Sequence, residues 1–290
     1  MSRKETRNTT RRGFVKEVAT GTAAVAVAGA FAVADAAPVS QSRKESGSLE
    51  ARFNAMEKRL QAVEDIQAIN RLQFAYNYYV EHMMKQEIID CFSDSPDVLL
   101  DWLEGKWKGK AGVRKYFDVT RVAPVGFRHQ LMPTGGLITL SPDGKTAKGR
   151  WYAFGAIMMQ RPQPKEQQPK QEQQKQEQQR PGGSFVNGIY EMGYVKEDGI
   201  WKIMSINWII PYSVTIADGW RMPEDIARPF LTRQGSAPGQ PAQMQADIPV
   251  DKNDLRYVTG YIFPYHFKHP VTGKPSSEAT LNARLNPAKV

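Results

Sequence analysis

The sequence predicts an α+β fold in which helices come first and a curved antiparallel sheet follows. A helical pattern of apolar positions begins near Ser48, and the stretch 72–92 has the pattern of a helix end, a turn and a second helix. From residue 127 onward, alternating apolar segments are separated by turn residues such as Asp143-Gly144. Helices followed by a run of strands are typical of the α+β class.

Composition favours one globular domain with attachments. The 290-residue chain is 41% hydrophobic and carries a net charge of +9. Its basic residues are scattered and form no stripe interleaved with aromatic residues, which argues against a nucleic-acid partner. The single cysteine, Cys91, excludes an intramolecular disulfide, and its position beside Phe92 fits core packing.

The first 36 residues have the pattern of an export signal. Arg11-Arg12-Gly13-Phe14 precedes the apolar run 18–34, and Ala34-Asp35-Ala36 supplies a small-x-small cleavage site. This segment resembles a bacterial twin-arginine signal, which implies the twin-arginine export machinery as a partner and a periplasmic or secreted location. The alternative is a retained membrane anchor, for which the apolar run is short.

Residues 37–48 are expected to form a solvated linker before a long helix that has Glu50 in its first turn. The helix opens with apolar residues in the 4-3-4-3 spacing of a coiled coil: Leu49, Phe53, Met56, Leu60 and Val63. This seam either packs on the domain or makes a subunit contact, and we expect a homo-oligomer (dimer or trimer). The apolar stripe then continues to Tyr76, as in a helix that lies on a sheet.

The end of this helix places Glu81 and His82 among aromatic residues. A carboxylate on an apolar helical face is costly to bury unless a partner satisfies it, which makes Glu81 a candidate for a cavity. The alternative is that both residues face water at the helix C-terminus.

The remaining elements follow in order. We expect a strand at 98–102, a turn at 105–109 that leads into a short helix, two short strands within 127–140, and strands at 146–160, 185–196 and 200–210. The insertion 161–183 is rich in Gln and is expected to be largely disordered, without a catalytic role. The domain then spans 49–222, and residues 223–290 form a C-terminal extension whose aromatic part, 255–269, drapes over the domain or a neighbouring subunit.

Several motifs in this order carry a family resemblance over residues 63–220. They are the helix positions Ile69, Leu72, Tyr76, Glu81 and Phe92, the turn Gly105-Lys106-Trp107-Lys108-Gly109, the strand start Phe127-Arg128-His129, and the closing strands around Tyr190 and Trp201. Together they resemble the SnoaL-like family of the nuclear transport factor 2-like superfamily. The resemblance implies a cone-shaped curved antiparallel sheet, packed with the N-terminal helices around a deep apolar pocket.

The resemblance also implies site residues. Enzymes of this group, such as scytalone dehydratase and hexachlorocyclohexane dehydrochlorinase, abstract a proton with a His–Asp pair, whose positions correspond to His129 and Glu81 here. The carboxylate is one methylene longer, so Glu81 either orients His129 or acts directly on the substrate. The alternative for His129 is a core histidine bonded to a backbone carbonyl.

Aromatic residues are expected to complete the pocket. Tyr76 is our candidate donor to a departing hydroxyl, and the candidate wall residues, most of them also core aromatics, are Tyr78, Trp102, Trp107, Phe127, Trp151, Tyr190 and Trp208. We expect no cofactor and no metal, because His266 and His269 lack a nearby carboxylate or cysteine to complete a site.

These features favour a cofactor-independent lyase or dehydratase, or an isomerase, that acts on a small hydroxylated aromatic compound. Similarity to formaldehyde lyases of lignin-derived diarylpropanes implies loss of water and formaldehyde to give a stilbene. The alternative is a non-catalytic periplasmic small-molecule-binding or assembly protein. The same fold serves enzymes and binding proteins. The Glu in place of Asp and the Gln-rich insertion favour the binding protein.

Overall fold

The computed structural model describes residues 48–120, 127–158, 183–215, 219–221, 246–251, 253–254, 264–277 and 279. Four predicted segments lie outside these residues: the export signal 1–36, the linker before Ser48, the insertion up to residue 182, and the aromatic stretch 255–263. Gly183, assigned above to the insertion, belongs instead to a strand.

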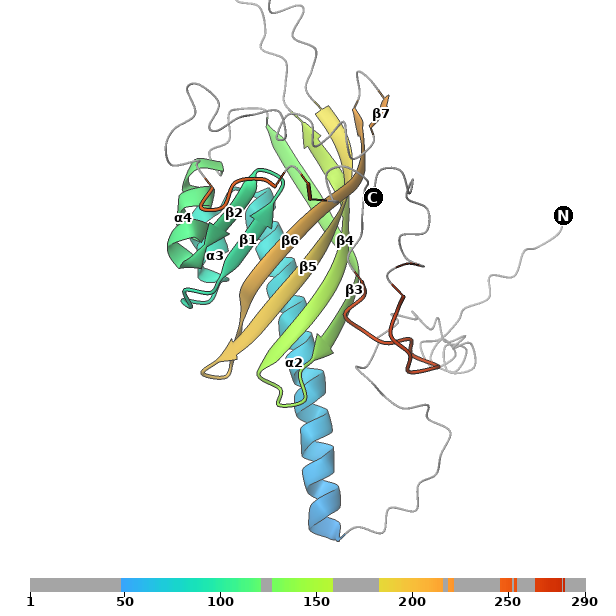
Figure 1. Cartoon of the computed structure of the whole chain (residues 1–290). Helices are drawn as coiled ribbons and strands as arrows, with labels where there is room; N and C mark the ends of the chain where they lie inside the picture. The colour runs from blue at the N-terminus through green and yellow to red at the C-terminus, as the bar shows by residue number, and fades with distance from the viewer. Residues whose placement is uncertain are drawn as a thin grey trace, which may run out of the picture. The chain divides into compact units, whose positions relative to one another are not determined.

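The helices follow the predicted pattern closely. α2 (Leu49–Glu81) is 33 residues long and begins where Ser48 Oγ accepts a hydrogen bond from the Ala51 amide at 3.2 Å. A turn separates it from α3 (Lys85–Asp90), and α4 (Gly109–Thr120) comes after the first two strands. In Figure 1 the strands curve across the second half of α2, while its first half extends beyond the hairpins.

The strands form one curved sheet, which confirms the α+β fold. Its order is β2-β1-β6-β5-β4-β3, with β7 paired to β6. The bounds are β1 (Leu99–Trp102), β2 (Gly105–Lys108), β3 (Arg128–Leu140), β4 (Thr146–Met158), β5 (Gly183–Glu197), β6 (Ile200–Thr215) and β7 (Gly219–Arg221). Between the described strands all pairs are antiparallel except β1 with β6, which was not expected. These two strands are far apart in sequence, so no hairpin dictates their relative direction.

Two further predictions about the strands were wrong. Residues 105–108 form the strand β2 and not only a turn. Residues 128–140 form one strand, because a bulge between Thr134 and Leu137 absorbs the irregular Pro-Thr-Gly-Gly sequence. Gly135 has φ 59°, and a Cβ on Gly136 would lie 2.1 Å from the Trp151 ring, so the bulge requires both glycines.

A buried chain of hydrogen bonds joins α2 to three strands. Trp151 Nε1 donates to the Tyr194 hydroxyl at 3.0 Å, and that hydroxyl donates to Gln73 Oε1 at 2.7 Å. Gln73 Nε2 donates to Asn77 Oδ1 at 2.8 Å, and Asn77 Nδ2 donates to the Leu131 carbonyl at 3.4 Å. All five residues are buried, so each bond satisfies polar groups that water cannot reach.

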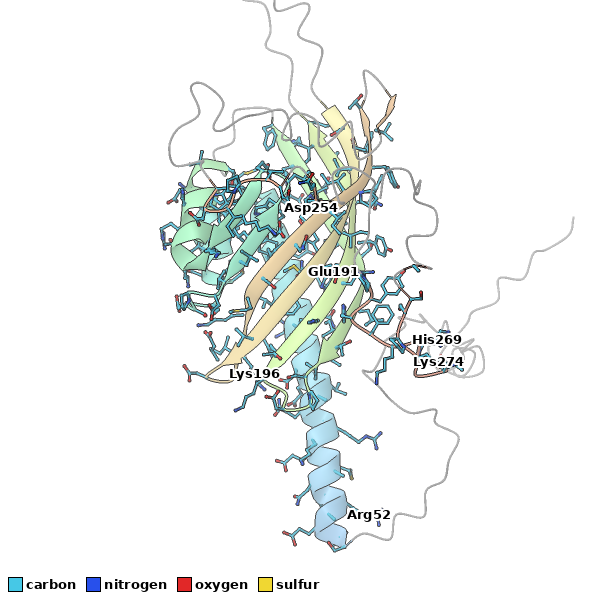
Figure 2. All side chains as sticks on the ribbon, viewed as in Figure 1. Arg52, Glu191, Lys196, Asp254, His269 and Lys274 are labelled. Atoms are coloured by element: carbon cyan, nitrogen blue, oxygen red, sulfur yellow. The ribbon has the colours of Figure 1, made fainter. Side chains whose placement is uncertain are left out.

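A second anchor lies further down the same helix. Asp65 is 4% exposed and accepts hydrogen bonds from Lys196 Nζ at 2.7 Å and Trp201 Nε1 at 2.9 Å. Lys196 comes from the end of β5, beside the helix in Figure 2. Burial by itself would raise the pKa of Asp65, but the hydrogen bonds from Lys196 and Trp201 outweigh it and hold that pKa below its ordinary value of 3.8.

Two described parts of the C-terminal extension, around Ile248 and around Tyr265, pack on the domain. Ile248 exchanges two backbone hydrogen bonds with Lys106 of β2, at 2.9 and 3.1 Å. On the outward face of the sheet, the Arg150 guanidinium lies 4.4 Å from the centre of the Tyr265 ring and pairs with Glu191 of the neighbouring strand. The extension therefore buries an arginine on a face that would otherwise be exposed to solvent.

Removing the central hydroxyl of the buried chain should destabilise the fold. Tyr194→Phe leaves the Trp151 N–H and the Gln73 carbonyl oxygen unpaired in the interior, which we expect to lower the free energy of unfolding by about 2–4 kcal/mol. Urea unfolding measures the change. Tyr152→Phe, at the outward-facing and 41% exposed Tyr152 of β4, is the matched control and should stay within about 0.5 kcal/mol of the wild type. If the two substitutions lowered the free energy of unfolding equally, the stabilising role given to the buried hydrogen-bond chain would be contradicted.

Asp65 should make stability depend on acid pH. Because its folded-state pKa is depressed, its contribution is fully present above the unfolded value near 3.8 and is lost as the pH falls through the lower folded-state value. Asp65→Asn should therefore lower stability at pH 7 by about 1–3 kcal/mol and flatten the decline of stability below pH 4. Asp118→Asn, whose carboxylate pairs with Lys85 at the surface at 3.7 Å, is the control and should change neither quantity. If stability declined below pH 4 in Asp65→Asn as steeply as in the wild type, other carboxylates would be responsible for that decline.

Candidate functional site

Aromatic side chains from β1, β5 and β6 meet on the inward side of the sheet. The Tyr190 and Trp208 rings are 4.3 Å apart, and the Trp102 ring lies 6.4 Å from each of them, nearly edge-on. All three are less than 10% exposed. We call Trp102, Tyr190 and Trp208 the aromatic cluster. The three rings belong to the buried hydrophobic core of the domain.

Helix α4 adds a further aromatic ring beside this cluster. Tyr116 stacks on Trp102 at 5.7 Å with an interplanar angle of 22°, and its ring lies 4.7 Å from that of Trp107. Trp107 is 1% exposed, and its Nε1 has no hydrogen-bond partner among the described residues. A buried N–H group without an acceptor lowers the stability of the fold by about 1–3 kcal/mol. The Trp107 N–H is therefore a candidate donor to a bound oxygen atom.

His129 lies near the start of β3, on its inward face. It lies two residues before Leu131, which is 6% exposed and points into the interior. Because every second side chain of a strand points to the same face, His129 and Leu131 share one side of β3. The imidazole is half-buried, and its ring centre lies 6.4 Å from that of Phe127. The structure therefore brings Phe127 and His129 together at one end of the interior.

Glu81 lies at the same end. Gln73, Asn77 and Glu81 are spaced four residues apart, so they share one face of α2, and the first two contact the sheet interior. The helix runs from Asp65, near the β5–β6 hairpin, toward Asn77, opposite Leu131. From that contact Glu81 is about 6 Å further along the helix and His129 about 7 Å further along the strand, in the same direction.

The two side chains are not joined directly. In the described structure no hydrogen bond or ion pair links Glu81 to His129, and Glu81 is half-buried. The pairing of His129 with Glu81 stays a prediction, and their similar level along the interior is inferred from the contact of Asn77 with Leu131. Catalytic hydrogen bonds that are absent without substrate commonly form once substrate is bound.

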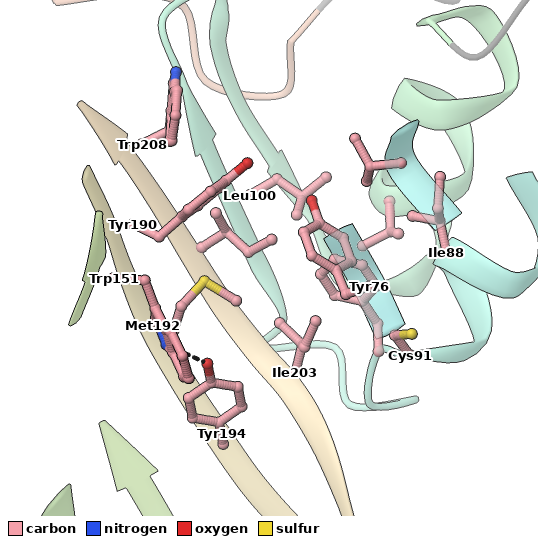
Figure 3. Packing of buried hydrophobic residues seen from close by; sticks show 14 of the residues in the cluster. Tyr76, Ile88, Cys91, Leu100, Trp151, Tyr190, Met192, Tyr194, Ile203 and Trp208 are labelled. Carbon is pink, nitrogen blue, oxygen red and sulfur yellow. Dashed lines mark hydrogen bonds between the residues drawn. The ribbon is translucent and has the colours of Figure 1, made fainter. Parts of the chain in front are cut away.

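Figure 3 places the candidate tyrosines. Tyr76 approaches from the helical side and Tyr190 from the sheet, and both hydroxyls point toward the Trp208 end of the cluster, away from Tyr194. Tyr76 is 1% exposed, with its ring edge-on to Phe92 at 5.9 Å. Tyr194 marks the end nearer Asp65, so both phenols point to the end that holds His129 and Glu81.

Three other residues take different positions. Trp151 is buried, but it serves the hydrogen-bond chain through Tyr194. Tyr78 is 58% exposed and lies about 200° around the helix from Tyr76, so the structure does not bring it to the aromatic cluster. His82 is exposed at the end of α2, where its Nδ1 donates to the Tyr78 carbonyl at 2.9 Å.

The polar residues Gln73, Asn77 and Tyr194 were missed from the sequence. The available signal was an amide at i and another at i+4 inside an otherwise apolar helical stripe. Such residues need buried partners, but a pattern within one helix does not identify them on distant strands.

The histidines of the C-terminal extension have separate surroundings. His266 Nδ1 lies 3.6 Å from Glu191 Oε2, while His269 Nδ1 accepts the Val271 amide at 3.1 Å. Among the described residues, no group of three or more His, Cys, Asp and Glu side chains is placed to hold a metal ion. None of the helices described is both long and apolar enough to span a bilayer.

Comparisons with known proteins identify one family. A family model described as a SnoaL-like domain matches residues 61–207, which include both His129 and Glu81. No curated protein matches the chain significantly.

Three solved structures illustrate more distant likenesses. A protein from Novosphingobium aromaticivorans, provisionally named a scytalone dehydratase, is 16% identical, with 53% of this chain and 88% of that chain covered and a TM-score of 0.41. The hexachlorocyclohexane dehydrochlorinase LinA-type3 from Novosphingobium barchaimii is 15% identical, with coverages of 55% and 94% and a TM-score of 0.42. A nuclear transport factor 2-like superfamily protein from Salmonella enterica is 13% identical, with coverages of 54% and 98% and a TM-score of 0.40.

Proposed function

We propose that this chain, which belongs to the SnoaL-like domain family, is a cofactor-independent lyase or dehydratase with His129 as its base. The observation that carries the proposal is the common level of His129 and Glu81 at the end of the interior toward which the phenols of Tyr76 and Tyr190 point. An inward imidazole, a carboxylate and a phenol supply the groups that an elimination needs. The motif Arg11-Arg12-Gly13-Phe14 supports a periplasmic or secreted site of action.

The proposed step is a general acid–base elimination. Neutral His129 takes a proton from the carbon next to the one that bears the hydroxyl, and the C–H electron pair forms the new double bond. The hydroxyl leaves with its bonding electrons and becomes water by accepting the Tyr76 proton. Glu81 stabilises the imidazolium that forms, because a carboxylate close to the ring favours its charged state. His129 then returns its proton to the phenolate, directly or through water, which closes the cycle.

The interior favours a hydroxylated aromatic substrate. The aromatic cluster offers ring faces, and Trp107 offers a buried N–H to an oxygen atom of the ligand. In a lignin-derived diarylpropane, His129 would instead take the hydroxyl proton of the terminal CH₂OH group. The O–H electrons then form the carbonyl of formaldehyde, the carbon–carbon bond breaks to form the stilbene double bond, and the neighbouring hydroxyl leaves as water.

A passive binding or assembly protein is the second candidate. Two observations favour it: the rings of Trp102, Tyr116 and Trp107 pack against one another, and no hydrogen bond joins Glu81 to His129 in the described structure. In that case the interior would hold a compound without changing it. A ligand that binds and is recovered intact after prolonged incubation would identify this function.

Turnover should depend on His129 and not on the neighbouring His82. The purified protein is incubated with hydroxylated aromatic compounds, including diarylpropanes, and mass spectrometry detects loss of water or of water and formaldehyde. On a compound that is converted, His129→Ala should lower the rate about 10²–10⁴-fold, as expected for a positioned general base. His82→Ala, which removes an exposed imidazole at the end of α2, is the matched control and should retain the wild-type rate.

The Glu81 variants refine the same assay. Glu81→Gln should lower the rate, because the imidazolium loses its carboxylate, whereas Glu81→Asp should retain part of it. The rate should rise with pH through one ionisation that is absent in His129→Ala. Near-normal turnover by His129→Ala would refute the mechanism.

A further inference from the structure

The first half of α2 is an apolar helix face with no covering in the described structure. All residues from Ser48 to Gln61 are exposed, and Figure 2 shows the side chains around Arg52 projecting beyond the sheet. We call the following five residues the seam: Leu49 is 67% exposed, Phe53 61%, Met56 63%, Leu60 60% and Val63 45%. Large apolar side chains at a regular 4-3-4-3 spacing on one face are unfavourable in water.

The seam cannot pack on its own domain. At about 100° per residue, its five positions centre roughly 150° around the helix from the positions that face the domain, such as Asp65, Ile69 and Tyr76. Those positions are all buried, and Asp65 is held by Lys196 and Trp201. Rotating the helix to bury the seam on the sheet would expose the other set. Within the residues that the structure describes, the seam therefore does not pack on the domain.

The charges beside the seam specify what covers it. When Phe53 and Leu60 occupy a positions and the other seam residues d positions, the e positions are Glu50, Glu57 and Glu64. The g positions are Arg52 and Arg59. One edge of the seam is therefore acidic and the other basic.

This arrangement distinguishes the two directions of pairing. In a parallel pair, each g residue faces the e residue five positions later on the other helix, so that Arg52 meets Glu57 and Arg59 meets Glu64. In an antiparallel pair, g faces g and e faces e, which sets arginine against arginine and glutamate against glutamate. Opposite charges favour the parallel arrangement, and like charges oppose the other.

We propose that the seam binds the same seam of a second copy of this chain, parallel and in register. The pairing buries the ten apolar side chains of two seams and places four arginine–glutamate pairs along their edges. Two heptads of coiled coil are short, so the association is reversible and depends on protein concentration. The domain assists it by fixing the C-terminal half of each helix, which spares the seam the cost of helix nucleation.

Charge reversal tests both the surface and the direction. Sedimentation velocity of the purified protein measures the dissociation constant of the pair. Arg59→Glu or Glu64→Arg should each weaken association at least tenfold, whereas the double variant R59E/E64R should return it to within about threefold of the wild type. Lys58→Glu makes the same charge change at the outward f position and is the matched control, with no effect expected. Circular dichroism checks that all four variants keep their fold.

A cysteine experiment tests the register. In a parallel pair, each Leu60 faces Leu60 of the other chain, so the L60C variant should form a disulfide-linked dimer under mild oxidation while K58C should not. The native Cys91 gives no background, because it is buried and burial raises the pKa of its thiol to about 12.

Three results would overturn the proposal. The first is a monomer at every concentration reached. The second is an oligomer that R59E and E64R leave unchanged, because its interface then lies elsewhere. The third is tighter association of R59E, which would show an antiparallel pair relieved of its arginine–arginine repulsion. A disulfide in K58C equal to that in L60C would likewise contradict the register.

Discussion

The buried hydrogen-bond chain that runs from Trp151 through Tyr194, Gln73 and Asn77 to the Leu131 carbonyl sets the geometry of the whole interior. Apolar packing alone tolerates sliding of a helix along a sheet, because dispersion contacts have no direction. Hydrogen bonds in a water-free interior do not tolerate it, since a shift of one residue leaves several polar groups unpaired. The chain thus fixes the level at which Glu81 stands relative to β3, and with it the reach of the candidate site.

Local signals predicted most of the fold. Ser48 begins the long helix and Asp198-Gly199 turns the β5–β6 hairpin with φ values of 49° and 80°, because capping and turn chemistry are decided by neighbouring residues. The uninterrupted β3 was not foreseen, because the bulge glycine Gly136 is explained by the ring of Trp151, which comes from another strand. The parallel pairing of β1 with β6 likewise depends on contacts distant in sequence.

The sequence likewise predicted some residues of the candidate site and missed others. The family pattern placed Tyr76 and Tyr190 in the buried interior and His129 on the inward side of β3, as the structure has them. Tyr78 was one of the aromatic residues expected in the pocket wall, but it is 58% exposed on the outward side of α2. Whether Glu81 meets His129 depends on side-chain geometry over a few ångströms, which no spacing in the sequence encodes. Arg150 was also not foreseen, because its burial depends on Tyr265, more than a hundred residues later.

Helix α2 contains neither glycine nor proline over its 33 residues. Helices bend sharply at such residues and otherwise behave as stiff rods, here about 50 Å long. One end of this rod carries the exposed apolar face, and the other carries Glu81. Between the two ends, Asp65, Gln73 and Asn77 hold the rod to the sheet, so a displacement of the free end is resisted at these buried contacts before it reaches Glu81.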